Sequence, residues 1–176
     1  MSAPKLYKHY QQLATDITTH HPEVHHSLGT VFMATTINLG DKVVTTKHRD
    51  FKNLANGLCA VVSMGNYDYK LGGHLVLHDK IKLIIEFPPG WVIFLPSASV
   101  THSNIGIADN EWRSSITFYT AGSLFRWVAY GFQGEKTLGT EQLKRMDGEK
   151  EDRWNNAINL FSKYEELKGD IETTYS

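Results

Sequence analysis

The sequence predicts an α+β fold dominated by β-strands, with a barrel or sandwich between two helical flanks. Between residues 31 and 120, short β-rich segments follow one another and are separated by Gly, Pro, Asn or Asp. Before and after this stretch, apolar residues recur at three- and four-residue steps, which is typical of amphipathic helices. The chain has 176 residues, of which 41% are hydrophobic and 21% charged, so it can bury its own core as a single domain.

The first predicted element is a helix over residues 4–20, within an N-terminal helical extension over residues 1–28. The proline near its start suits the first turn of a helix, where no N–H is needed. The apolar positions repeat with the period of a helix and predict one buried face. This face consists of Leu6, Tyr10, Leu13 and Ile17.

The predicted β core covers residues 29–133 and consists of closely spaced short strands, as in a barrel or sandwich. Successive side chains on a strand point to opposite sides. The last strand therefore presents Arg113, Ser115, Thr117 and Tyr119 on one face. The strands are predicted over residues 31–40, 41–50, 57–65, 73–87, 91–103 and 112–120.

The C-terminal part, residues 134–176, is more charged and is predicted to form a helical extension. Within it, residues 151–167 place apolar side chains at helical spacing and predict one amphipathic helix. Its apolar face consists of Trp154, Ile158, Phe161 and Leu167.

Charge and cysteine content exclude several classes of protein. The net charge is −1, so a nucleic-acid partner would have to be bound by a local groove rather than by a basic field over the whole surface. The single cysteine, Cys59, excludes internal disulfides and cysteine-based zinc modules, and suits a reducing compartment. No apolar run long enough to span a membrane and no signal-peptide or other targeting pattern is visible, so we expect an intracellular protein without a membrane partner.

The segment His48-Arg49-Asp50 directly follows a β-rich run. Residues two apart on a strand point to the same face, so an imidazole and a carboxylate can converge on one metal ion. The pattern is common by chance, and the chain contains another example in His21-Pro22-Glu23. The prediction of a metal site at His48 and Asp50 therefore depends on further residues.

Two later features support this prediction. His102, at the end of an apolar strand, would complete two histidines and one carboxylate, the facial triad of non-haem Fe(II) oxygenases. Arg113 and Ser115 share one strand face, and a guanidinium there could bind the distal carboxylate of 2-oxoglutarate through paired hydrogen bonds. Each residue taken alone also fits a plainer interpretation, His102 as a hydrogen-bonded core histidine and Arg113 as half of a surface ion pair.

The motifs HRDFKNLANG and RSSITFYT resemble those of the TET/JBP nucleobase hydroxylases, which are 2-oxoglutarate/Fe(II) dioxygenases with a double-stranded β-helix, or jelly-roll, core. The resemblance covers residues 28–133 and is greatest to the small TET/JBP-like proteins of mushroom-type fungi (basidiomycetes). It implies His48, Asp50 and His102 as iron ligands, Arg113 and Ser115 as 2-oxoglutarate ligands, Asn53 as a contact to the target base, and Tyr119 as the ring that stacks on it.

The resemblance implies one catalytic domain over residues 1–176 that uses Fe(II), 2-oxoglutarate and O₂. Its reaction would oxidise a methyl group on a nucleobase. The foremost substrate is 5-methylcytosine in DNA, which would be oxidised to 5-hydroxymethylcytosine and further, as in DNA demethylation. The base would be flipped out of the duplex. It further implies a nuclear location, and we expect a monomer without a protein partner. Alternatives are N6-methyladenine, thymine or an RNA base as substrate, a protein hydroxylase, and a non-enzymatic nucleic-acid-binding barrel.

Two further features bear on the substrate. Lysines and an arginine around the predicted cavity mouth could meet phosphates, although charged loops are usually only solvated. These residues are Lys42, Lys47, Arg49, Lys52 and Lys70. The chain departs from the animal enzymes at Ala121, where they have a histidine, and it has too few cysteines for their zinc region.

Overall fold

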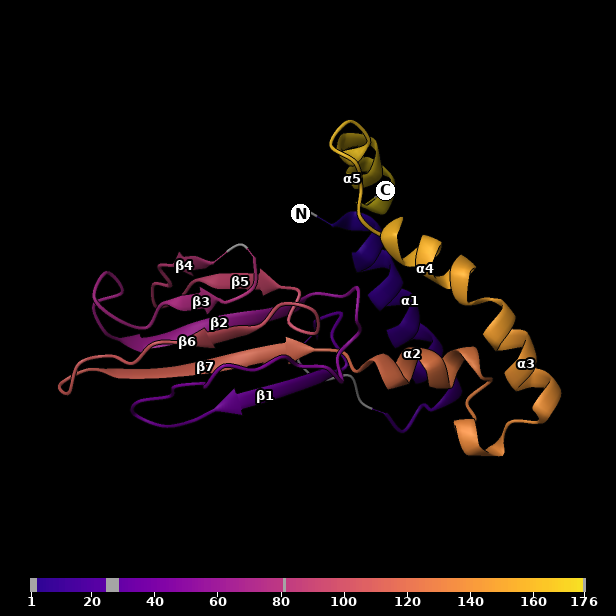
Figure 1. The fold of residues 1–176 in the computed structure, drawn as a ribbon, viewed down its shortest axis with the longest axis horizontal. Helices are drawn as coiled ribbons and strands as arrows, with labels where there is room; N and C mark the ends of the chain where they lie inside the picture. The colour runs from indigo at the N-terminus through magenta and orange to yellow at the C-terminus, as the bar shows by residue number, and fades with distance from the viewer. Residues whose placement is uncertain (1–2, 25–28, 81, 176) are drawn as a thin grey trace. The chain divides into compact units, whose positions relative to one another are not determined.

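The computed structural model describes residues 3–24, 29–80 and 82–175 (Figure 1). Its contacts divide the chain into two compact units. The β unit is Phe32–Gly122, and the helical unit combines Met1–Val31 with Ser123–Ser176. The predicted core boundaries at residues 29 and 133 stay a prediction, and residues 25–28 next to the first boundary lie outside the described residues.

The β unit contains two antiparallel sheets (Figure 1). The larger sheet has the order β1-β7-β2-β5 and the smaller sheet the order β4-β3-β6. The strands of the larger sheet are β1 (Ala34–Asn38), β7 (Trp112–Tyr119), β2 (Cys59–Asn66) and β5 (Val92–Leu95). Those of the smaller sheet are β4 (Leu83–Ile85), β3 (Leu75–Leu77) and β6 (His102–Asn104).

The chain passes back and forth between these two sheets. It runs from β1 and β2 in the larger sheet to β3 and β4 in the smaller one, then to β5, β6 and β7 in alternate sheets. The segment between β1 and β2 touches the smaller sheet through a bridge between His48 and His102. This winding is that of a double-stranded β-helix, and it confirms the predicted β-dominated α+β fold with flanking helices.

The core of the β unit lies between the sheets. Its buried members are Cys59, Leu75, Phe87 and Leu95, and Tyr119 packs against them. Gly65 on β2 pairs with Arg113 on β7. A Cβ at Gly65 would lie 2.2 Å from the Trp112 carbonyl oxygen, and its φ of 144° is one that side chains rarely adopt, so only glycine lets β7 approach here.

The predicted strand over residues 41–50 is wrong. This segment makes only isolated bridges, Lys42 with Arg113 and His48 with His102. Between them the Asn104 side chain replaces the strand ladder, because its Oδ1 accepts from the Thr45 N–H at 2.7 Å and its Nδ2 donates to the Val43 carbonyl at 3.2 Å. A side chain from a distant strand therefore holds the segment.

Two other predicted strands are each divided in two. Residues 73–87 form β3 and β4 around a reversal at which the Lys82 N–H donates to the Asp79 carbonyl at 3.0 Å; residue 81 is not among those described. Residues 91–103 form β5 and β6, separated by a turn in which the Val100 N–H donates to the Pro96 carbonyl at 3.0 Å. The first reversal pairs β3 with β4, and the second turn takes the chain from the larger sheet to the smaller one.

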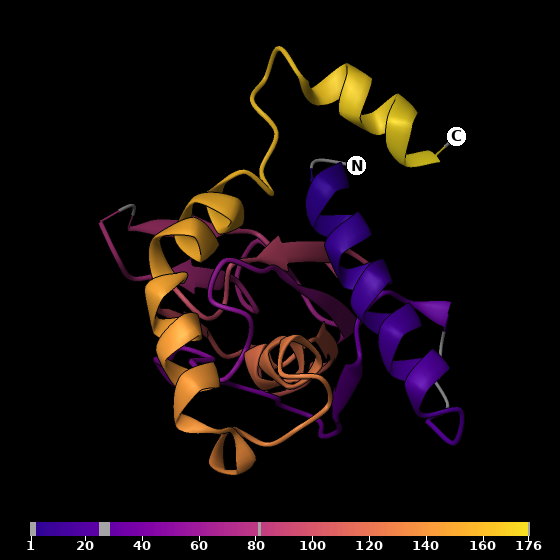
Figure 2. The same cartoon turned by 90° about the vertical axis from the view of Figure 1, so that its right-hand side faces the viewer.

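The helical unit begins with α1 (Pro4–His20), which confirms the first predicted helix and its four buried apolar residues. Phe125 of α2 (Gly122–Ala129) packs against α1, with its ring 5.7 Å from that of Tyr10. Figure 2 shows α5 (Leu167–Tyr175) near the start of α1. There Lys5 forms ion pairs with Glu166, directly before α5, and with Asp170 within it.

The remaining elements are η2 (Glu135–Thr137), α3 (Thr140–Gly148) and α4 (Lys150–Ile158). The single helix predicted over residues 151–167 is wrong, because α4 ends at Ile158. There the Leu160 and Phe161 N–H groups donate to the carbonyls of Ala157 and Ile158, only three residues earlier, which tightens and closes the last turn. Among the described helices, none has the length and apolar character needed to cross a membrane.

Candidate active site

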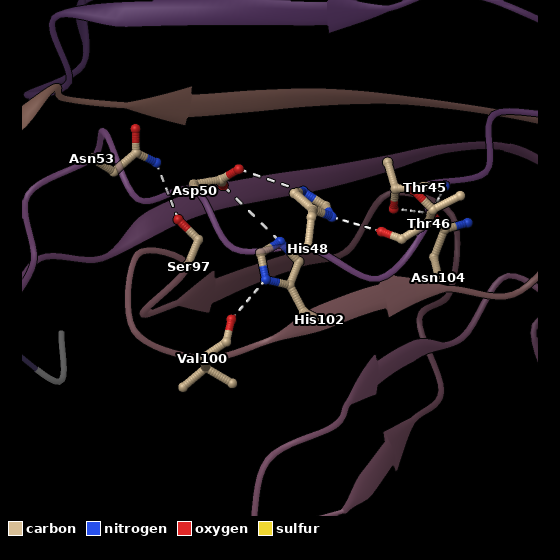
Figure 3. A network of polar contacts seen from close by, with 9 residues as sticks. All are labelled: Thr45, Thr46, His48, Asp50, Asn53, Ser97, Val100, His102 and Asn104. Atoms are coloured by element: carbon tan, nitrogen blue, oxygen red, sulfur yellow. Dashed lines mark hydrogen bonds and ion pairs between the residues drawn. The ribbon is translucent and has the colours of Figure 1, made fainter.

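The structure brings together the three residues predicted to bind a metal (Figure 3). His48 Nε2 lies 3.4 Å from Asp50 Oδ1, and His102 Nε2 lies 4.0 Å from Asp50 Oδ2. One potential ligand atom from each residue lies within 4.8 Å of the others. Two imidazole nitrogens and a carboxylate oxygen therefore face one small volume, as a facial triad requires.

Both imidazoles are oriented by backbone carbonyls (Figure 3). His48 Nδ1 lies 2.7 Å from the Thr46 carbonyl oxygen, and His102 Nδ1 lies 2.9 Å from that of Val100. A carbonyl oxygen can only accept, so each Nδ1 carries a hydrogen, and in a neutral ring Nε2 is then the nitrogen with the lone pair that can bind a metal. Outer hydrogen bonds of this kind fix ring orientation in metal sites.

The electrostatics of His102 also favour the neutral form. Burial lowers the pKa of His102, and nearby His48 lowers it further, which outweighs the opposite effects of the Val100 carbonyl and Asp50. A neutral imidazole is the form that binds metal.

Different backbone hydrogen bonds position the three residues of the triad. His48 and His102 exchange both backbone hydrogen bonds, with N–H to O=C distances of 3.0 and 2.9 Å. Asp50 lies beyond this bridge, where its N–H donates to the Ser97 carbonyl at 2.9 Å. His48 and Asp50 therefore face one volume as expected, but they do not belong to a strand, because the segment forms only the isolated bridge at His48.

Arg113 lines the same cavity as the triad. This cavity has a volume of about 480 Å³. Arg113 is only 3% exposed, so the interpretation as a surface ion pair is excluded. Its Nη1 donates to the Val43 carbonyl at 3.0 Å, its Nε has no hydrogen-bond partner, and no carboxylate of the described residues pairs with it. A buried guanidinium with unused donors suits an anionic ligand.

Ser115, two residues along β7, is also buried and lines the cavity. Its Oγ accepts from Asn38 Nδ2 at 3.1 Å. Thr117 and Tyr119 follow on the same lining face, so all four positions predicted to share one face of this strand do so.

Asn53 and Tyr119 both line the cavity. Asn53 Nδ2 donates to Ser97 Oγ at 3.1 Å, and Tyr119 is partly buried, with its hydroxyl accepting from Thr36 Oγ1 at 3.4 Å. The cavity is therefore lined by an amide and an aromatic ring as well as by the triad. Their roles toward a base stay predictions.

Sequence reasoning did not single out Asn104 or Asp79. Asn104 is two residues after His102 on β6, so its place on the cavity follows from the period of a strand. Asp79 Oδ1 accepts from Arg49 Nη2 at 3.0 Å, and its Oδ2 accepts from the Thr101 N–H at 2.7 Å. No local pattern signals this carboxylate, since its partners are distant in sequence.

Asp79 connects the two segments that bear the triad. Arg49 lies between His48 and Asp50, and its Nε donates to Thr101 Oγ1 at 2.7 Å, next to His102. The Thr101 N–H, and then Arg49, lower the pKa of Asp79, so this carboxylate is ionised near neutral pH.

Among the five predicted cations, Arg49 and Lys52 line the cavity, whereas Lys42, Lys47 and Lys70 do not. Lys42 forms an ion pair with Asp109 instead. Only two of the five residues are therefore placed to meet a ligand at this site.

No family model matches the chain, and no curated protein matches its sequence. Solved structures that match include NgTET1 in complex with 5mC DNA, at 19% identity and a TM-score of 0.46 over 67% of this chain and 48% of that chain.

Two further matches have lower TM-scores. An oxidoreductase of the 2OG-Fe(II) oxygenase family from Burkholderia pseudomallei has 22% identity and a TM-score of 0.35 over 52% of this chain and 47% of that one. The viral collagen prolyl hydroxylase of Paramecium bursaria Chlorella virus-1, in its 2OG complex, has 10% identity and a TM-score of 0.33 over 64% of this chain and 71% of that one. The chain spans about half the length of the first two proteins.

Proposed function

We propose that this chain is an Fe(II)- and 2-oxoglutarate-dependent dioxygenase that oxidises the methyl group of a modified nucleobase, foremost 5-methylcytosine in DNA. One observation carries the proposal. A triad of two oriented imidazoles and a carboxylate lines the same cavity as a buried arginine without an acidic partner among the described residues. The first group suits a metal and the second an organic anion.

His48 and His102 would bind Fe(II) through Nε2, and Asp50 through a carboxylate oxygen. The donor set fits, since the carbonyl bonds to Nδ1 leave Nε2 of both rings facing the carboxylate that lies between them. When bound, Fe(II) with 2-oxoglutarate and O₂ supplies the oxidation of a C–H to a C–OH bond, with succinate and CO₂ as coproducts. Three protein ligands leave coordination positions for the cosubstrates.

Arg113 would bind the distal carboxylate of 2-oxoglutarate, and the Ser115 hydroxyl would add a hydrogen bond. The guanidinium is buried, so an anion in contact with it interacts more strongly than at a solvated surface. Its unpartnered Nε supports this role, because a buried donor gains most from a partner.

Asn53 would contact the edge of the target base and Tyr119 would stack on its face. Both line the cavity, and a base inside a duplex cannot enter a cavity, so the base must be flipped out. The finer assignments rest on the motif resemblance. They are 5-methylcytosine as the substrate, oxidation beyond 5-hydroxymethylcytosine, a role in DNA demethylation, relation to the fungal branch and a nuclear location. A monomer is expected.

The test is mass spectrometry of nucleosides after the purified protein is given Fe(II), ascorbate, 2-oxoglutarate and DNA containing 5-methylcytosine, N6-methyladenine and thymine. We expect oxidised 5-methylcytosine, which His48→Ala should not produce. Succinate without any oxidised base in DNA or RNA would remove the nucleobase assignment and favour a protein hydroxylase. The absence of both products and of Fe(II) binding would contradict the proposal as a whole.

A further inference from the structure

A tight turn over residues 50–53 lies at the edge of the cavity. The Asn53 N–H donates to the Asp50 carbonyl at 2.8 Å, which closes the turn and leaves Phe51 and Lys52 at its two corners. Phe51 is 80% exposed, yet it lines the cavity together with Lys52. One short turn therefore carries a predicted metal ligand, an exposed aromatic ring, a cation and the predicted base contact.

The turn is fixed by hydrogen bonds to two other segments. The Asp50 N–H donates to the Ser97 carbonyl at 2.9 Å, and Asn53 Nδ2 donates to Ser97 Oγ at 3.1 Å (Figure 3). On the other side, the Lys52 carbonyl accepts from the Gly122 N–H at 2.9 Å. These bonds set the backbone position of Phe51 before any ligand arrives, which lowers the entropy lost on binding.

An exposed phenylalanine is ordinary on its own. Phe51 differs through its surroundings, because it gains little burial from the fold and stands beside Lys52, which forms no ion pair among the described residues. Arg49, the other cation on the cavity, already donates to Thr101 and Asp79. Lys52 is thus the available charge next to the exposed ring.

A ring and a cation on adjacent residues match the repeating unit of a nucleic-acid strand, which alternates planar bases and charged phosphates. We propose that Phe51 and Lys52 form a strand-holding site at the cavity, at which Phe51 stacks on a base beside the target base and Lys52 binds a phosphate. This inference rests on the nucleic-acid part of the proposed function. It separates two aromatic roles, Tyr119 for the target base and Phe51 for its neighbour.

The test is fluorescence anisotropy with labelled single-stranded DNA, duplex DNA and RNA that contain 5-methylcytosine. Fe(II) and 2-oxoglutarate are omitted, so that binding is measured and not turnover. We expect Phe51→Ala to weaken binding about ten-fold or more, as for loss of one stacked base. Phe51→Trp should keep the affinity, whereas Phe51→Leu should lose it, because leucine is apolar but has no π-face.

Lys52→Ala should reduce the magnitude of the slope of log affinity against log salt by about one, as expected for the loss of one phosphate contact. Two matched controls lie off the cavity. Phe94 on β5 is 56% exposed, so Phe94→Ala should bind as the wild type does, and Lys70→Ala should keep the wild-type salt slope. Thermal unfolding of the Phe51 variants should match the wild type, because the side chain is exposed.

The outcomes separate the two proposals. Wild-type protein that binds none of the three nucleic acids would contradict the nucleic-acid assignment, and with it this inference. Wild-type protein that binds, with Phe51→Ala or Phe51→Leu at wild-type affinity, would overturn the strand-holding site and leave the proposed function intact. Equal losses in Phe51→Ala and Phe94→Ala would overturn it as well, since the effect would not be local to the cavity.

Discussion

The two halves of the cavity are built in different ways. At one end, Arg113 and Ser115 belong to β7, a regular strand paired on both sides with β1 and β2. At the other, His48 to Asn53 lie on an irregular segment held by an isolated bridge, a closed turn and side-chain hydrogen bonds. The proposed anion site is therefore part of the sheet, whereas the proposed metal site depends on a few individual bonds between distant segments.

The largest expected effect is at the triad. Asp50→Ala removes the only carboxylate of the metal-binding cluster found among the described residues, so metal affinity should fall more than about a hundred-fold, beyond the usual loss for an outer partner. Titration with Fe(II) or Co(II), followed by calorimetry, measures this. Exposed Asp109, paired with Lys42 away from the cavity, provides the control variant Asp109→Ala. Metal affinity unchanged in Asp50→Ala would rule out this triad as the metal site.

At the sheet end, Arg113→Ala should abolish 2-oxoglutarate binding and leave metal affinity nearly unchanged. Loss of one partner from a buried charged pair costs about 2–5 kcal/mol. Arg113→Lys should recover part of the affinity, because lysine keeps the charge but not the paired donors. Arg126→Ala, on α2, is the matched control. Equal 2-oxoglutarate affinity in Arg113→Ala and wild type would contradict the anion site.

Replacement of Arg113 should lower 2-oxoglutarate affinity but raise the stability of the ligand-free protein. Without its ligand, the guanidinium is a buried charge that no acidic residue among those described offsets, so Arg113→Met should raise the melting temperature of the ligand-free protein. 2-Oxoglutarate should stabilise the wild type and not this variant. Thermal unfolding with and without 2-oxoglutarate measures both. A lower melting temperature in the ligand-free variant would mean that the Val43 hydrogen bond and the packing outweigh the buried charge.

A smaller effect is expected from Asp79, which joins the neighbours of the triad without belonging to it. Asp79→Asn should weaken metal binding about ten-fold, the lower end for outer partners, because Arg49 and Thr101 lose their charged acceptor. Asp109→Asn removes a carboxylate from an ion pair of similar chemistry away from the cavity and should leave metal affinity unchanged. If both variants behave as the wild type, Asp79 has no positioning role.

The smallest expected effect is on the pH dependence of stability. Burial lowers the pKa of His102 below its usual value of 6.5, so the unfolded chain binds a proton more readily than the folded one. Stability of the metal-free protein should therefore decrease as the pH falls through about 6.5. His102→Gln should make this decrease shallower; His9, whose pKa burial also lowers, accounts for part of the remainder. An unchanged pH profile in His102→Gln would contradict the neutral, buried state of this ring.

The difference between the two ends of the cavity also explains which sequence predictions succeeded. The alternation in residues 112–119 correctly places Arg113, Ser115, Thr117 and Tyr119 on one lining face, because side-chain direction on a regular strand follows from the backbone alone. The helix over residues 4–20 succeeds for the same reason. Residues 41–50 fail as a strand, since their hydrogen bonds go to the Asn104 side chain and to single bridges.

By itself, the sequence determined the residue types of the site, the periodic elements and the face on which Arg113 lies. Only the tertiary structure decided that the Ser97 carbonyl accepts from the Asp50 N–H, that Asp79 joins Arg49 to Thr101, and that Phe51 is left exposed at the cavity. Local periodicity follows from the geometry of each strand or helix, which neighbouring residues set. Contacts between segments 20 to 60 residues apart depend on how the two sheets close around the core, and no local pattern records them.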